Sequence, residues 1–266
     1  MELPLIGLGT WDLRGHACTK VVRQALEMGY PHIDTAHSYE NHTAIRPALK
    51  EFNREKFYLT SKLEIEEEVD AKKPTQSVQK ACDNALKELG TDYLDLYLIH
   101  WPYRDFPLDQ IFEEMENLVA QGKIRKAGVS NYNIHHLEDL GKAGHTPYAN
   151  QVEFHPYLNQ NELLLYCNAK NIRLIAYRPL GKGRLLQDEP IFAKIGQKYG
   201  KTGAQVILRW VIEQNIPVLV KSESEKHLRE NLEIFDFSLS QEDRDQIDSL
   251  DQKKRYCQPD HAEFSY

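Results

Sequence analysis

Four side chains at or shortly after the ends of short apolar segments have the chemistry to deliver a proton to a polar double bond. They are Asp34, Tyr39, Lys62 and His100. A tyrosine phenol has a reference pKa of about 10, too high for a ready acid at neutral pH. A lysine ammonium beside it stabilises the phenolate and lowers that pKa, and an aspartate keeps the lysine charged and oriented. The histidine can orient a substrate oxygen or join the proton transfer. Together they form a proton donor for a carbonyl group, with electrostatic stabilisation of the developing alkoxide.

Each of these residues, taken alone, also has an ordinary structural explanation. Asp34 suits a turn or a helix cap, Tyr39 a half-buried packing position, Lys62 a solvated loop and His100 a hydrogen-bonded place in the core. Buried Asp, Lys, Tyr and His groups are costly unless they are paired, and clusters of them usually mark functional sites. The functional interpretation therefore requires a fold that brings the four together.

Eight short apolar segments, mostly rich in Val, Ile, Leu or Tyr, are typical of buried parallel strands. They are Leu5–Leu8, His32–Asp34, Phe57–Ser61, Leu94–Ile99, Lys126–Val129, Ala149–Val152, Ile172–Ala176 and Ile216–Val220. Amphipathic patterns with helical spacing lie between them. The clearest are Ser77–Leu89, Leu108–Gln121 and Gly203–Gln214, and the weaker ones are 133–143, 160–169, 189–199 and 225–234.

This alternation implies parallel strands joined by helical crossovers. An open doubly wound sheet and a closed barrel both satisfy it. Eight units with little sequence left over favour a single-domain (β/α)8 TIM barrel over residues 1–266. The polar tail, about residues 251–266, is expected near the mouth of the barrel. Functional side chains in such a barrel lie at the carboxyl-terminal ends of the strands, and nearly every strand predicted here ends in a polar or ionisable residue.

The composition excludes several classes of protein. The chain has 266 residues, 41% hydrophobic and 27% charged, which is ordinary for a soluble globular protein. Its net charge of −7 disfavours non-specific binding to nucleic acid or an anionic membrane. No secretory signal or membrane span is evident, and the four cysteines contain no C-x-x-C pair, so we expect a cytoplasmic protein with reduced thiols. No exposed apolar stripe is evident, which favours a monomer.

Histidines at positions 32, 37 and 42 recur every five residues. Metal ligands on a helix need spacings of three or four, so no metal site is expected.

The chain resembles the aldo-keto reductases in a series of ordered motifs. They are GLGTW at Gly7–Trp11, HIDTAHSYEN at His32–Asn41, LTSKL at Leu59–Leu63, LIHWP at Leu98–Pro102, GVSNY at Gly128–Tyr132, NQVEFHPY at Asn150–Tyr157, AYRPLGKG at Ala176–Gly183 and KSxxxxHLREN from Lys221 to Asn231. The short loop after Trp101 and the compact tail are similar to the bacterial members of the family, such as 2,5-diketogluconate reductases and aldehyde reductases. The resemblance implies NAD(P)H-dependent reduction of aldehydes or ketones to alcohols.

The resemblance also implies roles for individual residues. Asp34, Tyr39, Lys62 and His100 match the catalytic tetrad of the family, with Tyr39 as the general acid. The positions that match its cofactor contacts, from the nicotinamide to the adenosine end, are Ser130, Asn131, Gln151, Tyr177, Leu180, Gly181, Lys221, Ser222, Ser224, Glu230 and Asn231. The expected partners are thus a nicotinamide cofactor and a small carbonyl substrate.

One departure concerns the choice of cofactor. His227 stands where the family usually has an arginine, and a histidine only approximates the bidentate grip of a guanidinium on a phosphate. Glu223 and Glu225 add negative charge nearby. NADPH is the expected cofactor, with NADH as an alternative and a smaller preference than is usual in the family.

Aromatic residues are expected to line the substrate pocket, chiefly Trp11 and Trp101, with Phe264 of the tail as a further candidate. Arg178 replaces a common serine and either reaches the cofactor pyrophosphate or is a surface residue. A cofactor-binding regulatory or structural protein with this fold and little turnover is the alternative function. The complete tetrad favours the enzyme.

Overall fold

Eight parallel strands close into a barrel in the computed structural model, which describes residues 1–266. Each strand pairs with the next along the chain, and β8 pairs with β1. The strands are β1 (Ile6–Gly9), β2 (His32–Asp34), β3 (Tyr58–Leu63), β4 (Leu96–Ile99), β5 (Ala127–Ser130), β6 (Ala149–Glu153), β7 (Arg173–Tyr177) and β8 (Val218–Val220). This confirms the predicted (β/α)8 barrel, and every strand begins and ends within two residues of its predicted segment.

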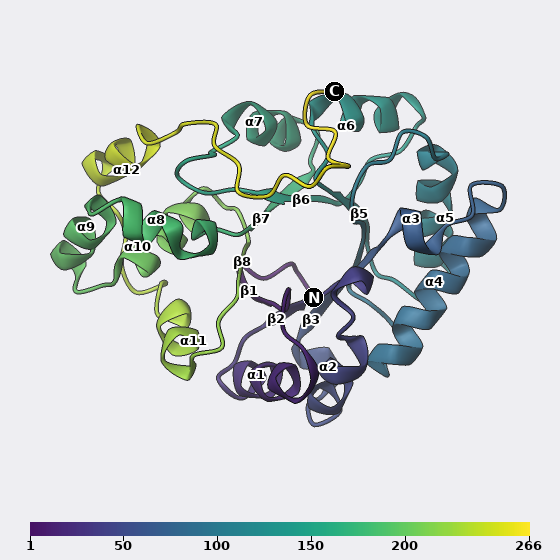
Figure 1. Cartoon of the computed structure of the whole chain (residues 1–266), viewed down its shortest axis with the longest axis horizontal. Coiled ribbons are helices and arrows are strands. Elements are labelled where there is room, and N and C mark those ends of the chain that lie inside the picture. Colours follow the sequence, from purple (N-terminus) through teal and green to yellow (C-terminus); the bar gives the residue numbers. More distant parts are fainter.

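Helices surround the ring of strands (Figure 1). They are α1 (Gly15–Glu27), α2 (His42–Leu49), α3 (Ile65–Glu68), α4 (Pro74–Leu89), α5 (Leu108–Ala120), α6 (Ile134–Lys142), α7 (Asn161–Ala169), α8 (Arg184–Asp188), α9 (Ile191–Tyr199), α10 (Gly203–Glu213), α11 (Glu225–Leu232) and α12 (Gln241–Asp248), with short 3-10 turns η1 (His37–Tyr39), η2 (Arg54–Lys56) and η3 (Gly181–Gly183). None is both long enough and apolar enough to cross a bilayer.

The seven helices predicted from the sequence are all present, but others were missed. The clearest omission is α1, in which Cys18, Val21, Val22 and Ala25 recur at helical spacing and are buried. That periodicity was sufficient to predict the helix. It packs against α2 in the outer layer of the barrel (Figure 1).

Alternation of side chains along the strands gives the barrel an apolar base beneath a polar rim. Successive side chains of a strand point to opposite faces, so Tyr58, Thr60 and Lys62 share one face of β3. Tyr58 belongs to a buried apolar cluster with Leu3, Leu96, Leu98, Ala149, Ile175 and Leu219. Lys62 lies two steps further along the same face, so its charge is placed above a base that excludes water.

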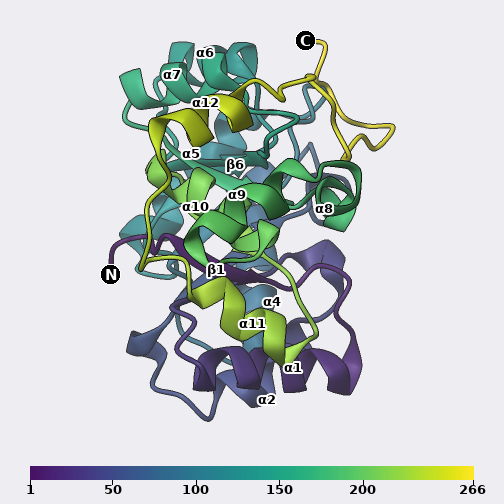
Figure 2. The same cartoon turned by 90° about the vertical axis from the view of Figure 1, so that its left-hand side faces the viewer.

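A buried carboxylate fixes the C-terminal tail over the barrel. Glu153, at the end of β6, is completely buried and accepts the backbone N–H groups of Tyr256 and Cys257 at 2.9 and 3.0 Å. The tail crosses over β6 and β7 in Figure 1, and in Figure 2 it lies on the same side as α8. The tail therefore lies at the carboxyl-terminal ends of the strands, where the candidate site is found.

Candidate active site

The four ionisable side chains singled out in the sequence meet at the carboxyl-terminal end of the barrel. Asp34 ends β2, Tyr39 ends η1, Lys62 lies in β3 and His100 directly follows β4. The Nζ atom of Lys62 donates to Oδ1 of Asp34 at 2.6 Å and to the Tyr39 hydroxyl at 3.3 Å. The rings of Tyr39 and His100 pack edge to face with centroids 5.7 Å apart. The fold thus gathers these residues into one cluster.

The Lys62 ammonium is buried, and each of its three protons has an acceptor within reach. Besides Asp34 and Tyr39, the backbone carbonyl of Thr35 accepts from Nζ at 3.0 Å. Burial lowers the pKa of Lys62, but the charges and hydrogen bonds of Asp34 and Tyr39 outweigh it, so the pKa is raised. Lys62 is therefore a fixed positive charge beside the phenol.

The pKa of Tyr39 differs from the expectation drawn from the sequence, which had Lys62 lowering it. Burial raises the pKa of this phenol, and the opposing charge of Lys62 does not overcome that effect. The hydroxyl consequently keeps its proton at neutral pH, as a proton donor must. The adjacent ammonium still favours the phenolate that remains after the proton has left.

The residues predicted for the nicotinamide end form a network that continues from this cluster. Gln151 Nε2 donates to Oδ2 of Asp34 at 2.7 Å, and the Ser130 hydroxyl donates to the backbone carbonyl of Gln151 at 2.7 Å. The Tyr177 hydroxyl donates to Oδ1 of Asn131, also at 2.7 Å. Asn131 has a φ of +64°, a left-handed conformation that asparagine tolerates better than most residues.

This set of groups fits a nicotinamide. Its carboxamide needs both donors and acceptors, which side-chain amides and a hydroxyl supply, and its flat ring suits an aromatic face. Ser130, Asn131, Gln151 and Tyr177 provide these groups within one hydrogen-bonded network beside Asp34.

The loop after β7, which contains the predicted residues Leu180 and Gly181, contacts both the tail and the turn that follows β1. Gly181 has a φ of +54°, and an added Cβ would lie 2.7 Å from the Tyr256 ring, so a side chain is excluded there. Arg178 donates to the backbone carbonyl of Tyr256 at 3.0 Å, and its guanidinium lies 5.1 Å from the Trp11 ring centroid. Arg178 is thus an anchored residue of this loop.

The residues predicted for the adenosine end lie just after β8 and on α11. They are Lys221, Ser222, Ser224, His227, Glu230 and Asn231. The Ser224 hydroxyl caps α11 by accepting the backbone N–H of His227, whose side chain is exposed. Lys221 is paired with Glu223 at 2.7 Å. The charge of Lys221 is therefore partly neutralised by this carboxylate.

The two tryptophans predicted to line the pocket differ in exposure. Trp11 is 41% exposed, whereas Trp101 is only 7% exposed. The rings of His261 and Phe264 pack against Trp101 with centroid distances of 5.1 and 5.9 Å. Trp101 also lies beside His100. The tail therefore covers much of Trp101, and Trp11 presents the more accessible aromatic surface.

Glu64, which was not predicted from the sequence, contacts the cluster directly. Its Oε2 lies 2.9 Å from Nδ1 of His100, and the residue is 7% exposed. Glu64 comes two residues after Lys62, so the alternation of β3 continues to the same face. That spacing indicates the face on which Glu64 lies, but not its contact with His100.

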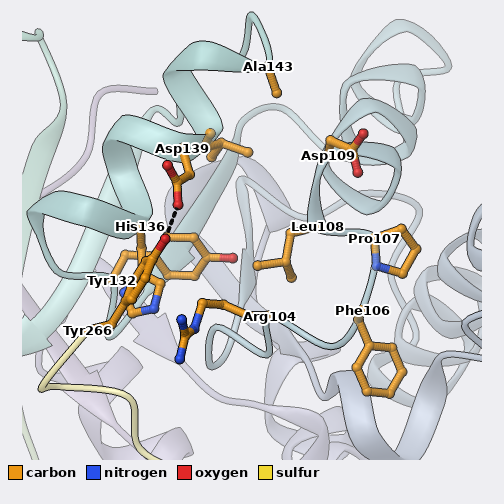
Figure 3. A pocket seen from close by; sticks show the side chains of 11 residues that line it. Arg104, Phe106, Pro107, Leu108, Asp109, Tyr132, His136, Asp139, Ala143 and Tyr266 are labelled. Carbon is orange, nitrogen blue, oxygen red and sulfur yellow. Dashed lines mark hydrogen bonds between the residues drawn. The ribbon is translucent and has the colours of Figure 1, made fainter.

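A cavity of about 410 Å³ lies apart from this cluster, between the beginning of α5 and helix α6 (Figure 3). Its lining includes Arg104, Leu108, Tyr132 and Tyr266, and the Tyr266 hydroxyl donates to Asp139. It contains none of the residues predicted for the reaction, so the chemistry is assigned to the cluster at the strand ends.

Comparisons with known proteins agree with this geometry. The sequence model of the aldo/keto reductase family matches residues 5–252. A glyoxal reductase of Bacillus subtilis (strain 168) is 42% identical over 259 residues, which cover 96% of this chain and 91% of that protein. The structure of MGS-M4, an aldo-keto reductase from a Medee basin deep-sea metagenome library, superposes with a TM-score of 0.90 at 38% identity and covers 96% of this chain and 94% of its own.

A putative 2,5-diketo-D-gluconic acid reductase B superposes with a TM-score of 0.91 at 31% identity, over 98% of this chain and 92% of that one. These similarities confirm the resemblance to bacterial-type members that the motifs indicated. With the barrel and the ordered motifs, they establish that this chain belongs to the aldo/keto reductase family.

Proposed function

We propose that this protein reduces aldehydes or ketones to alcohols with NADPH, and that Tyr39 donates the proton to the carbonyl oxygen. Membership of the family supports carbonyl reduction with a nicotinamide cofactor. The observation that carries the role of Tyr39 is the 3.3 Å contact between its hydroxyl and a lysine that is itself paired with Asp34 at 2.6 Å.

When bound, the cofactor supplies the hydride. Ser130, Asn131 and Gln151 would hold its carboxamide, and Tyr177 would lie against its ring. As negative charge develops on the carbonyl oxygen, the Tyr39 hydroxyl transfers its proton to that oxygen. Lys62 stabilises the phenolate that remains, and Asp34 keeps Lys62 charged and in place.

At the adenosine end, Lys221, Ser222 and Ser224 are the groups we assign to the 2′-phosphate of NADPH. The pairing of Lys221 with Glu223, and a histidine at position 227, support a modest preference over NADH. We also propose a monomer located in the cytoplasm, built as one barrel domain over residues 1–266. A small aldehyde is the proposed substrate class, and glyoxal is the first compound to test because a 42% identical relative is named for its reduction.

The test follows the absorbance of NADPH mixed with the protein and glyoxal. Tyr39→Phe keeps the ring and removes the acid, so kcat should fall about 10²-fold or more while the dissociation constant of NADPH stays near that of the parent. Tyr199→Phe is the matched control, because its hydroxyl contacts Asp243 outside the site. Equal rates for Tyr39→Phe and the parent would refute the mechanism. A parent that binds NADPH tightly but reduces none of a panel of aldehydes would favour the regulatory alternative.

A further inference from the structure

One ring nitrogen of His100 contacts a buried carboxylate. Glu64 Oε2 lies 2.9 Å from Nδ1, and the Ser38 hydroxyl approaches the same nitrogen at 3.3 Å. The second nitrogen, Nε2, makes no hydrogen bond within the protein and is not among the fully buried unpartnered atoms. Because Ser38 and Glu64 both contact Nδ1, they cannot form a hydrolase triad, which needs a partner on each nitrogen.

The charge of Glu64 determines where the imidazole carries its proton. Burial raises the pKa of Glu64, but its hydrogen bond to His100 and the charge of that residue overcome this effect, so the pKa is lowered. An ionised carboxylate only accepts hydrogen bonds, so Nδ1 must carry a proton. Neutral His100 then has a lone pair at Nε2, and only the charged imidazolium has an N–H there.

We propose that Glu64 is a positioning residue that acts through His100. Its carboxylate holds the proton on Nδ1, so that Nε2 donates to a carbonyl oxygen only when the imidazole is charged. This inference rests on the proposed carbonyl reduction. It adds that reduction slows as the pH rises through the titration of His100, and that Glu64 sets the pH at which this happens.

The direction of the effect follows from the groups around the ring. Burial and the charge of Lys62 lower the pKa of His100, whereas Glu64 and Asp34 raise it, with a lowered pKa as the result. Removal of the Glu64 charge takes away the largest contribution that raises the pKa of His100. The pKa of His100 should therefore fall further, and the loss of reductase activity should begin at a lower pH.

Other ionisable groups pack around Glu64 and need controls. Glu68 of α3 accepts the backbone N–H of Glu64 at 2.9 Å, and burial raises the pKa of Glu68 to about 7. The charge of His261, in the tail, lowers the pKa of Glu64. Glu67 is an exposed neighbour that lies 3.4 Å from His37 instead of His100.

The kinetic test measures kcat for aldehyde reduction from about pH 4 to about pH 8, because the pKa of His100 lies below the usual histidine value and should fall further in the variant. In Glu64→Gln the fall in kcat on the alkaline side should move down by about one pH unit or more, the usual effect of an adjacent opposite charge. The dissociation constant of NADPH should not change. In Glu67→Gln and Glu68→Gln, kcat should fall at the same pH as in the parent. Superposable profiles for Glu64→Gln and the parent, or equal shifts in the two controls, would overturn the proposal.

A second measurement does not require turnover. Nitrogen-15 NMR of histidine-labelled protein reports the protonated nitrogen and the pKa of His100, with the signal assigned by its absence in His100→Asn. Neutral His100 in the parent should carry its proton on Nδ1, and Glu64→Gln should lower its pKa. A neutral parent protonated on Nε2 refutes the role of Glu64 even if the protein reduces aldehydes. If the NMR result is as expected but no aldehyde is reduced, the proposed function fails instead.

Discussion

Replacement of Asp34 by asparagine tests the buried ion pair on which the candidate site depends. The side chains of Lys62 and Asp34 are 0% and 4% exposed and lie 2.6 Å apart. Asp34→Asn removes the negative charge that faces the ammonium and leaves one neutral amide oxygen, for which Lys62 and Gln151 compete, beside the Thr35 carbonyl and the Tyr39 hydroxyl. Loss of one partner from a buried pair costs about 3–5 kcal/mol, because the other charge stays buried without compensation. This is a large part of a typical total stability of about 5–15 kcal/mol.

The free energy of unfolding in urea should therefore fall by about 3–5 kcal/mol in Asp34→Asn. The double variant Asp34→Asn/Lys62→Met buries no charge at this position and should be more stable than Asp34→Asn alone. Lys62→Met completes the cycle. If Asp34→Asn does not fold, recovery of a folded double variant still tests the argument. A double variant as unstable as the single one would refute it.

The free energy of unfolding of Asp34→Asn should also depend on pH in a defined direction. In the parent, the pKa of Lys62 is raised, so its stabilising contribution is fully present below the unfolded value of about 10.4 and is lost only as the pH rises through the folded value. In Asp34→Asn, burial acts without the main opposing charge and lowers that pKa, so stability is lost as the pH falls. The difference in unfolding free energy between parent and variant should therefore become smaller as the pH rises toward the unfolded lysine value of about 10.4. A difference that does not change with pH would contradict the assigned charge state.

Three further outcomes are expected. His227→Arg should lower the dissociation constant of NADPH by about one to two powers of ten and leave that of NADH unchanged, as measured by quenching of protein fluorescence. Equal tightening for both cofactors would show that His227 does not face the 2′-phosphate. Borohydride added with substrate should trap no adduct on Lys62 by intact mass, since Asp34 keeps the amine protonated; a stoichiometric adduct would contradict this. Glu153→Gln keeps only one acceptor oxygen for two backbone N–H groups, so amide hydrogen exchange in residues 251–266 should become faster. An unchanged exchange rate would show that Glu153 does not anchor the tail.

The positions of Asp34, Lys62 and His100 could be predicted because they depend on where strands end. Each lies at or next to the end of a strand, and the closed barrel brings all strand ends to one rim. The approach of Tyr39 to Lys62 depends on η1, a turn whose geometry the sequence pattern did not indicate. The pairing itself was predicted from the chemistry of the two side chains, and the family resemblance supported it.

The partner of His100 could not be predicted in the same way. Glu64 begins an acidic stretch that continues with Glu66, Glu67 and Glu68, a pattern typical of a solvated helix start. The pattern does not show that this one carboxylate is buried and that its Oε2 contacts Nδ1 of His100. Likewise, Glu223 was recognised only as a nearby negative charge, and its ion pair with Lys221 depends on how the two flexible side chains lie.

The Asp34 carboxylate joins the part of the site to which we assign proton donation to the part assigned to the nicotinamide. Oδ1 accepts from Lys62 at 2.6 Å, and Oδ2 accepts from Gln151 at 2.7 Å, so both oxygens are occupied. An asparagine has one acceptor oxygen and one donor NH2 group, so it can accept from only one of these partners and must direct hydrogens at the other. Asp34→Asn should therefore disturb Gln151 as well as Lys62. For this reason, loss of activity in that variant alone cannot be assigned to proton transfer, whereas Tyr39→Phe removes the acid and leaves both contacts of Asp34 in place.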